Sequence, residues 1–280
     1  MSLMLKLLTT ISLLSINLYA GTLSVLDKKV IEYEKKRISL NSRYELKDVN
    51  IYLKKELASL NGWTGYVLQI NLLVNKKTIK IKDILYTNGT AITPELKDLE
   101  KGKDYKDLLS PSMPDSYYDN KHLIAGDQNA TNKIVVFSDP LCPFCIDYIP
   151  EVIKHIEENN NIALYYYHFP LLRIHPASNV ITKAMVVAHN KGIKNVVSKI
   201  YNAKFEDSFE ADEKDIKKIL KEINKALDSN ITITELSSQR VLNEIKNDNL
   251  KASDMLVSGT PTIFINGEVD RTRKKFKTLK

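Results

Sequence analysis

Hydrophobic positions divide the first hundred residues into one helix and several strands. One face of residues 22–39 carries apolar side chains at helical spacing, at Leu23, Leu26, Val30 and Tyr33. The period then becomes two, with alternating apolar positions at Val49, Ile51 and Leu53 and at Tyr66, Leu68, Ile70, Leu72 and Val74. Turn signals separate three strands at Asn61-Gly62, Asn75-Lys76-Lys77 and Asn88-Gly89. The pattern therefore predicts a small α+β domain at 21–108, with a helix, an antiparallel meander and an exposed edge strand.

The second half of the chain alternates strands with helices. Residues 134–137 are continuously apolar, as in a strand buried on both faces, and 163–168 form the next predicted strand. Helical spacing predicts helices at Ile146–Ile156, 177–190, 192–203, 212–227 and 234–250. A strand at 263–265 and the turn signal Asn266-Gly267 predict a C-terminal hairpin. We expect an α+β domain at 133–280, with a helical insertion at about 177–257 and a short final helix after residue 272.

Residues 109–132 are rich in Pro, Ser, Asp, Asn and Gly, the composition of a connecting segment. We expect this segment to be a linker between the two domains. It is expected to include a short helix near Tyr117 to Ile124.

The N-terminus has the pattern of a secretory signal peptide. Residues 1–20 contain a cation at Lys6, an apolar stretch from Leu7 to Leu18 and a small residue at Ala20. The stretch is interrupted by Thr, Ser and Asn and is shorter than the roughly 20 apolar residues that a spanning helix needs. We therefore expect cleavage after Ala20 and a mature chain that is soluble outside the cytoplasm.

Charge gives little reason to expect a nucleic-acid partner. The formal net charge of +7 becomes +6 when Lys6 is removed with the signal. The lysines are spread along the chain and interleaved with Asp and Glu, as in 214–222. This pattern is typical of solvated helix faces rather than of a track for nucleic acid.

The strongest chemical signal is the pair Cys142 and Cys145, the only cysteines, in the sequence FSDPLCPFC between a predicted strand and a predicted helix. Unpaired N–H groups and the dipole at a helix N-terminus favour a thiolate. Cys142 is therefore expected to be the exposed nucleophile and Cys145 the buried resolving thiol. A zinc or iron–sulfur site would need further ligands, and a structural disulfide would close too small a loop to stabilise much.

The histidines do not add a metal site. His122, His155 and His189 lie at scattered positions, and His168 and His175 flank FPLLRI. These last two residues could approach the active-site face, although histidine at strand and helix ends commonly packs structurally. We expect no metal and no cofactor.

FSDPLCPFC together with GTPTIFING at 259–267 resembles the thioredoxin-fold Dsb proteins of the bacterial periplasm, most closely the DsbC and DsbG disulfide isomerases. The resemblance covers about 124–280. It implies a thioredoxin-like fold, a cis Pro261 facing the dithiol, peptide binding by the Thr260 backbone, and redox tuning by Pro143 and Phe144. Thioredoxin and the DsbA oxidases resemble one another in carrying an acidic residue six positions before the first cysteine. In this sequence that position is Val136, as in the isomerase branch. Asp139 also fits the isomerase branch, although an Asp before Pro is equally often a turn former.

The resemblance also implies a function. We expect a periplasmic thiol:disulfide oxidoreductase that isomerises or reduces non-native disulfides in unfolded or misfolded secreted proteins and exchanges electrons with a membrane redox partner. The N-terminal domain, a cystatin-like helix and sheet, would hold substrate or form a homodimer like that of DsbC and DsbG. Two alternatives are a DsbA-type dithiol oxidase and a periplasmic holdase chaperone.

Overall fold

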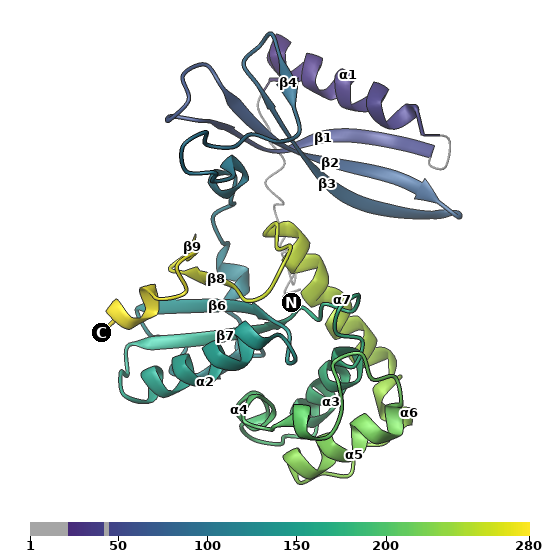
Figure 1. The fold of residues 1–280 in the computed structure, drawn as a ribbon, viewed down its shortest axis with the longest axis vertical. Helices are drawn as coiled ribbons and strands as arrows, with labels where there is room; N and C mark the ends of the chain where they lie inside the picture. Colours follow the sequence, from purple (N-terminus) through teal and green to yellow (C-terminus); the bar gives the residue numbers. More distant parts are fainter. Residues whose placement is uncertain (1–21, 42–44) are drawn as a thin grey trace, which may run out of the picture. The chain divides into compact units, whose positions relative to one another are not determined.

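The computed structural model describes residues 22–41 and 45–280, so the predicted signal peptide lies outside the described residues. The chain forms two compact units, the first ending at Leu109 and the second running from Ser110 to Lys280 (Figure 1). Within these described ranges, no helix combines the length and the apolar composition required to cross a membrane.

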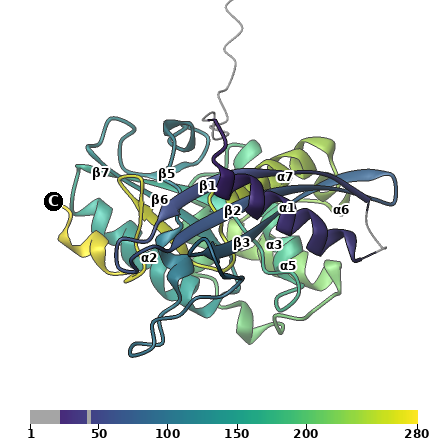
Figure 2. The ribbon, with the colours of Figure 1, turned by 90° about the horizontal axis from the view of Figure 1, so that it is seen from above.

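The first unit is a helix on a four-stranded antiparallel sheet. Its elements are α1 (Val25–Ser39), β1 (Glu45–Glu56), β2 (Thr64–Val74), β3 (Lys77–Thr87) and β4 (Ile92–Thr93), and the strand order is β1-β2-β3-β4. Figure 2 shows α1 lying along these strands. The predicted helix and meander are confirmed, and the short β4 is an addition.

The turn between β2 and β3 is one residue tighter than predicted. Val74 pairs with Lys77, which leaves only Asn75 and Lys76 in the loop, and their φ angles are 48° and 64°. Positive φ at both central residues matches the right-handed twist of a two-residue hairpin. Asn adopts this conformation more readily than most residues, and Lys77 is therefore the first residue of β3.

One carboxylate is buried in the first unit. Asp27 completes a capping box with Ser24 at the start of α1. Its carboxylate also accepts a hydrogen bond from the Tyr66 hydroxyl at 2.8 Å and lies 2.8 Å from the Lys54 ammonium group. Burial alone would raise the pKa of Asp27, but the hydrogen bonds from Lys54, Ser24 and Tyr66 together lower it to about 2. This cluster joins the helix to the sheet.

The second unit has a five-stranded sheet with helices packed around it (Figure 1). Its strands are β5 (Leu123–Ala125), β6 (Asn132–Ser138), β7 (Ile162–His168), β8 (Thr262–Ile265) and β9 (Glu268–Val269), in the order β5-β7-β6-β8-β9. Only β6 and β7 are parallel. The side chains of β6 from Ile134 to Phe137 are fully buried, as the continuous apolar run predicted.

One helix, α2 (Pro143–Glu157), follows β6, and five more separate β7 from β8. These five are α3 (Ser178–Asn190), α4 (Val196–Tyr201), α5 (Ile216–Leu227), α6 (Ile233–Leu236) and α7 (Gln239–Asp254). The helix predicted at 234–250 is confirmed from residue 239 onward but is interrupted near its start, because α6 ends at Leu236 and Ser238 takes extended backbone angles as the N-cap of α7. Serine at this position favours a new helix start over continuation.

The short helix predicted near Tyr117 to Ile124 is wrong. A 3-10 turn, η2, covers Asp115–Tyr117, and β5 then pairs with the edge of β7. The His122 carbonyl accepts the Tyr166 N–H at 2.8 Å just before β5 begins. Strand pairing satisfies backbone groups at the sheet edge that a local helix would have left unpaired. The chain ends in the 3-10 turn η4 (Lys275–Thr278).

Replacing Asp27 with Asn should lower the free energy of unfolding of the first unit by about 2 kcal/mol at pH 7, since a carboxyl pKa lowered by nearly two units corresponds to roughly that value. The stabilisation is present above the ordinary carboxyl pKa and is lost as pH falls through the folded pKa of about 2. Urea unfolding at pH 7 and pH 3, followed by the fluorescence of the sole tryptophan, Trp63, measures it.

The matched control is Glu32→Gln, which changes a well-exposed carboxylate on the same helix. We expect this surface substitution to change the free energy of unfolding by less than about 0.5 kcal/mol. Equal effects of the two substitutions would contradict the role given to the buried carboxylate.

Candidate functional site

The two cysteines lie where β6 passes into α2. Cys142 is the N-cap residue, with extended backbone angles, and Pro143 is the first helical residue, a position that proline suits because it needs no N–H partner there. The Cys142 N–H donates to the Asp139 carbonyl at 3.1 Å, and the Cys145 N–H donates to the Cys142 carbonyl at 2.8 Å. A tight turn and the first helical turn therefore hold both thiols.

The thiols are unequal in exposure, but Cys142 is less open than predicted. Cys142 is 4% exposed and Cys145 is fully buried, so the expectation of an exposed Cys142 is wrong, although the order of the two is as expected. The exposed residues are those between them: Pro143 is exposed, and Phe144 has 61% of its surface in solvent. Cys142 is covered because its sulfur lies against the segment before β8.

That segment contains the cis Thr260–Pro261 peptide bond, as the resemblance implied. When it is protonated, the Cys142 thiol donates to the Thr260 carbonyl, with 3.4 Å between sulfur and oxygen. Since β8 pairs with β6 in an antiparallel register, the sheet brings residues 118 positions apart in the sequence into contact.

The pKa values of the thiols move in opposite directions. The hydrogen bond from the Cys145 thiol is the largest effect on Cys142 and lowers its pKa to about 5, against burial, with further help from the Thr260 side chain and the N–H groups of Cys145 and Phe144. Burial first, and then the hydrogen bond to Cys142, raise the pKa of Cys145 far above its ordinary value. Cys142 is thus the thiolate at neutral pH, and Cys145 keeps its proton.

Asp139 binds the cysteine turn to the segment before α3. Its fully buried carboxylate accepts hydrogen bonds from four donors, which are the N–H of Leu141 at 2.8 Å, the N–H of Leu171 at 2.6 Å, the Ser178 hydroxyl at 2.5 Å and His175 Nδ1 at 3.0 Å. His175 thus reaches the site, as its position in the sequence suggested was possible. The role of Ser178 was missed, because a lone serine at the start of a predicted helix carries no signal for a contact 39 residues away.

A row of buried hydroxyl groups lies behind Cys145. The Ser138 side chain lowers the pKa of Cys145 by hydrogen bonding, though less than burial raises it. The Ser138 hydroxyl is 2.7 Å from that of Tyr201, which is 2.9 Å from that of Tyr166. Sequence reasoning could not find this row, because the three residues come from β6, β7 and α4.

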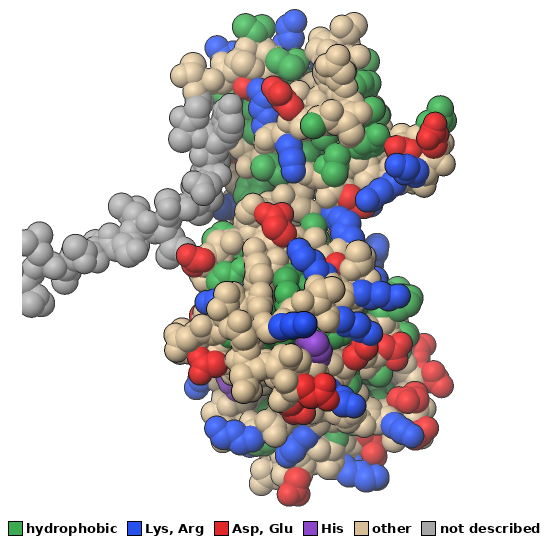
Figure 3. Space-filling model, turned by 90° about the vertical axis from the view of Figure 1, so that its left-hand side faces the viewer, with side chains coloured by type: hydrophobic (Ala, Val, Ile, Leu, Met, Phe, Trp, Pro, Cys, Tyr) green, Lys and Arg blue, Asp and Glu red, His purple; other side chains and the backbone are tan. Residues whose placement is uncertain are grey.

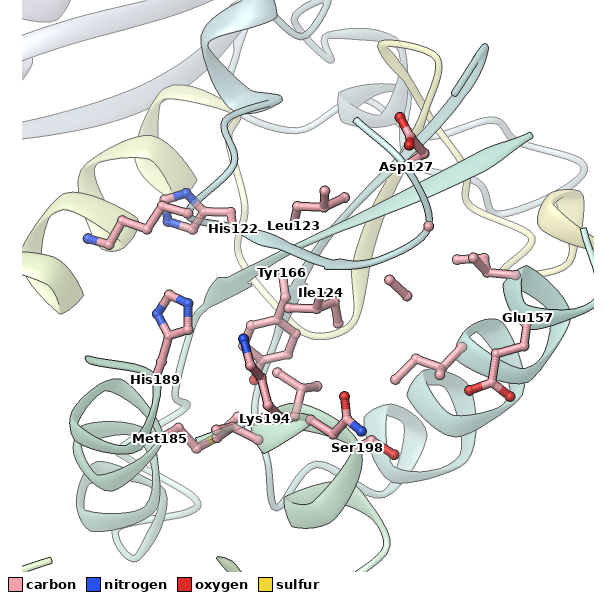
Figure 4. Close-up of a pocket in the computed structure, with 18 of the residues that line it drawn as sticks. His122, Leu123, Ile124, Asp127, Glu157, Tyr166, Met185, His189, Lys194 and Ser198 are labelled. Atoms are coloured by element: carbon pink, nitrogen blue, oxygen red, sulfur yellow. The ribbon is translucent and has the colours of Figure 1, made fainter. Parts of the chain in front are cut away.

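A cavity of about 1060 Å³ lies elsewhere in the second unit. Figure 4 shows His122, Tyr166, Met185, His189 and Lys194 around it. His168 also lines this cavity, so it does not join His175 at the dithiol. Neither cysteine nor the Thr260–Pro261 bond lines this space, and the described part of the chain contains no cluster of three or more His, Cys, Asp or Glu residues suited to a metal.

Replacing Cys145 with Ala should raise the pH midpoint for alkylation of Cys142 from about 5 toward the ordinary thiol value of 9.0. We expect a rise of about one pH unit or more, because the variant loses the largest stabilising hydrogen bond to the thiolate. Iodoacetamide rates measured against pH give the midpoint, with Cys142→Ser as the control for residual labelling. An unchanged midpoint would assign the low pKa to the helix N-terminus instead.

Replacing Asp139 with Asn should destabilise the second unit by about 3 kcal/mol, since an amide turns a donor toward groups that themselves donate. Urea unfolding followed by far-ultraviolet circular dichroism measures the change. The exposed Asp212→Asn is the matched control in the same unit. A loss below about 0.5 kcal/mol would show that the four hydrogen bonds contribute no more than an ordinary surface contact.

Two curated proteins match part of the chain. The Na⁺/H⁺ antiporter NhaA 3 of Salinispora tropica is 26% identical over 162 residues, and NhaA 1 of Salinispora arenicola is 27% identical over 161 residues. Each match covers 58% of this chain and 23% of the relative. The chain therefore spans less than a quarter of the length of these relatives.

Several solved structures are similar to part of the chain. A thioredoxin-like oxidoreductase of Silicibacter pomeroyi is 20% identical with a TM-score of 0.45, over 56% of this chain and 88% of that one. The catalytic domain of Proteus mirabilis ScsC is 19% identical with a TM-score of 0.45, over 59% and 92%. Oxidised BdbD of Bacillus subtilis is 15% identical with a TM-score of 0.46, over 60% and 91%.

A family model described as thioredoxin matches residues 119–280. This match is longer than half of the chain, and it includes both cysteines, Asp139 and the Thr260–Pro261 bond. The fold and the two-cysteine turn agree with the match, and the chain belongs to the thioredoxin family.

Proposed function

We propose that this protein is a thiol:disulfide oxidoreductase that reduces or isomerises non-native disulfides in exported proteins, as the DsbC and DsbG isomerases do. The observation that carries the proposal is the unequal thiol pair. Cys142 has a lowered pKa and is the more accessible sulfur, whereas the fully buried Cys145 hydrogen-bonds to it and keeps its proton. One thiol suits attack and the other suits the step that follows it.

In the proposed reduction of a substrate disulfide, the Cys142–Cys145 dithiol is the reductant. The Cys142 thiolate forms a bond to one sulfur of a substrate disulfide, and the other substrate sulfur leaves with the electron pair of the broken bond. The Cys145 thiol then loses its proton and attacks Cys142, which releases the second substrate sulfur as a thiolate. The substrate gains two thiols and the protein gains the Cys142–Cys145 disulfide. In isomerisation, a released substrate thiolate attacks the mixed disulfide instead and regenerates Cys142.

A second candidate, a dithiol oxidase, is favoured by the same low pKa. Stabilising the Cys142 thiolate stabilises the reduced protein, and a stabilised reduced form makes a disulfide more oxidising. The direction of electron flow therefore depends on the partner that resets the dithiol. We propose a membrane reductant for this role, because the motifs resemble the isomerase branch.

We further propose that the protein works in the periplasm and that the first unit holds substrate or a second copy of the chain. The signal-like pattern of residues 1–20 and the resemblance to DsbC and DsbG support this proposal. The first unit also exposes Ile79 and Ile81 on β3, each about 40% in solvent. Sedimentation of the full chain, compared with a form lacking residues 21–108, tests the dimer.

The full-length mature protein should restore activity to a scrambled multi-disulfide enzyme. Cys142→Ser should abolish this activity, because no nucleophile remains, and Cys145→Ala should accumulate mixed disulfides with substrate. Acid quenching of cells followed by alkylation then shows the direction of electron flow. A mostly reduced Cys142–Cys145 pair supports the isomerase or reductase, and a mostly oxidised pair supports the oxidase. Suppression of aggregation that survives Cys142→Ser, without any disulfide activity in the parent, would replace the proposal with a chaperone.

A further inference from the structure

The C-terminal segment 271–280 is strongly basic. Its sequence, RTRKKFKTLK, contains six cations and no acidic residue. Charge runs are commonly solvated faces, so the question is whether the structure fixes this segment in a useful place. Figure 1 shows the segment beside α2, the helix that begins at the dithiol.

The segment is anchored on both sides of its cations. Phe276 is 1% exposed, and its ring meets those of Tyr148 and His155 on α2 edge-on, with centroids 5.4 Å apart in each case. The Asp270 carboxylate accepts hydrogen bonds from the Thr272 N–H at 2.9 Å and the Lys275 N–H at 3.1 Å. The backbone that carries the cations is therefore held against the catalytic helix.

Arg273 contacts a residue that lies between the two cysteines in the sequence. Its guanidinium carbon is 4.8 Å from the ring centroid of Phe144, which is one of the two residues between Cys142 and Cys145. Arg273 has a φ of 59°, an unusual angle for a residue with a side chain. Such backbone conformations persist where surrounding contacts hold them, and they concentrate at functional sites. Here the contacts of Asp270 and Phe276 hold the backbone on either side of Arg273, whose guanidinium lies on the Phe144 ring.

Charge around Arg273 is only partly balanced. Lys277 pairs with Glu151 of α2 at 2.5 Å, and Asp147 is the other acidic residue on the exposed side of that helix near its start. Among the residues that the structure describes, no ion pair involves Arg273, Lys274 or Lys275, and all three side chains are exposed. Figure 3 views the molecule from the side on which Figure 1 shows the C-terminal segment, and Lys and Arg side chains are prominent there.

We propose that Arg273, Lys274 and Lys275 form a basic recognition surface that selects polypeptide segments with Asp or Glu beside the reacting cysteine. The proposal rests on the thiol:disulfide activity proposed above and names its preferred substrate class. A polypeptide partner is favoured over other anions because Arg273 contacts Phe144, the exposed residue between the two cysteines, where a chain joined to Cys142 would place its neighbouring residues. Acidic residues on a substrate would be attracted to these cations and speed its encounter with the protein, whereas basic residues would be repelled.

The test uses the full-length mature protein and three synthetic peptides with one cysteine, activated as a mixed disulfide with neutral thiopyridine. The peptides differ only in the residues flanking the cysteine, which are Glu, Gln or Lys. Stopped-flow release of thiopyridone gives the rate constant for attack by Cys142. At low salt, we expect the Glu peptide to react about tenfold faster than the Lys peptide. The difference should largely vanish at about 1 M salt, where charges are screened beyond roughly 3 Å.

Reversing the charges tests whether these three cations select the peptide. Arg273→Glu combined with Lys274→Glu and Lys275→Glu should abolish or invert the Glu-to-Lys ratio, and Arg273→Gln alone should reduce it. The control reverses the same number of charges at the exposed lysines Lys217, Lys221 and Lys225 of α5 and should keep the wild-type ratio. Each rate is divided by the rate of the Gln peptide in the same variant, because reversing charges near Phe144 also changes the reactivity of the Cys142 thiolate toward all three peptides.

The failures are distinguishable. Reaction with all three peptides at equal rates would overturn the recognition surface and leave the oxidoreductase proposal intact. No reaction with any peptide would overturn both. Binding to vesicles of anionic phospholipid that is lost on charge reversal, with an unchanged peptide ratio, would assign the cations to a membrane surface and overturn the proposal.

Discussion

The end of the second unit that carries the two cysteines depends on one buried carboxylate. Asp139 joins the turn that carries Cys142 to Leu171, His175 and Ser178 on the far side of β7. A buried charge is costly unless donors surround it, and here four donors satisfy both oxygens. The same interaction therefore solvates the carboxylate and fixes the loop, so neither segment can move without exposing unpaired polar groups.

With the turn fixed, the two sulfurs differ through their surroundings alone. Cys145 is enclosed by the core and backed by the Ser138 hydroxyl, and it donates a hydrogen bond that keeps Cys142 ionised. The Thr260 carbonyl lies against the more accessible sulfur, that of Cys142. The low pKa is thus a property of the pair, whereas the sequence had suggested the helix N-terminus as its main source.

Patterns that depend on neighbours in the chain were predictable, and contacts made by folding were not. The β6 run, the α2 periodicity and the two cysteines could be read directly, and the family resemblance supplied the cis bond at Pro261. In contrast, Asp139 before Pro140 looked equally like a turn former, because its burial depends on a segment more than 30 residues away. The exposure of Cys142 was overestimated for the same reason, because the distant segment before β8 covers its sulfur. The helix expected near Tyr117 failed because the free edge of β7 offered that segment better hydrogen bonds.

The segment that precedes β6 also decides where the second unit can be separated from the rest of the chain. The Tyr117 ring packs near those of Phe137 and Tyr167, and its hydroxyl donates to the Lys251 carbonyl on α7 at 2.9 Å. β5 covers the edge of β7 a few residues later. The segment 110–132 has the composition of a linker but is therefore part of the core of the second unit. A fragment that could be exchanged as a whole begins near residue 110 rather than 133. Recombination near residue 133 would produce a domain that lacks β5 at the edge of β7 and lacks the packing of Tyr117 against the core.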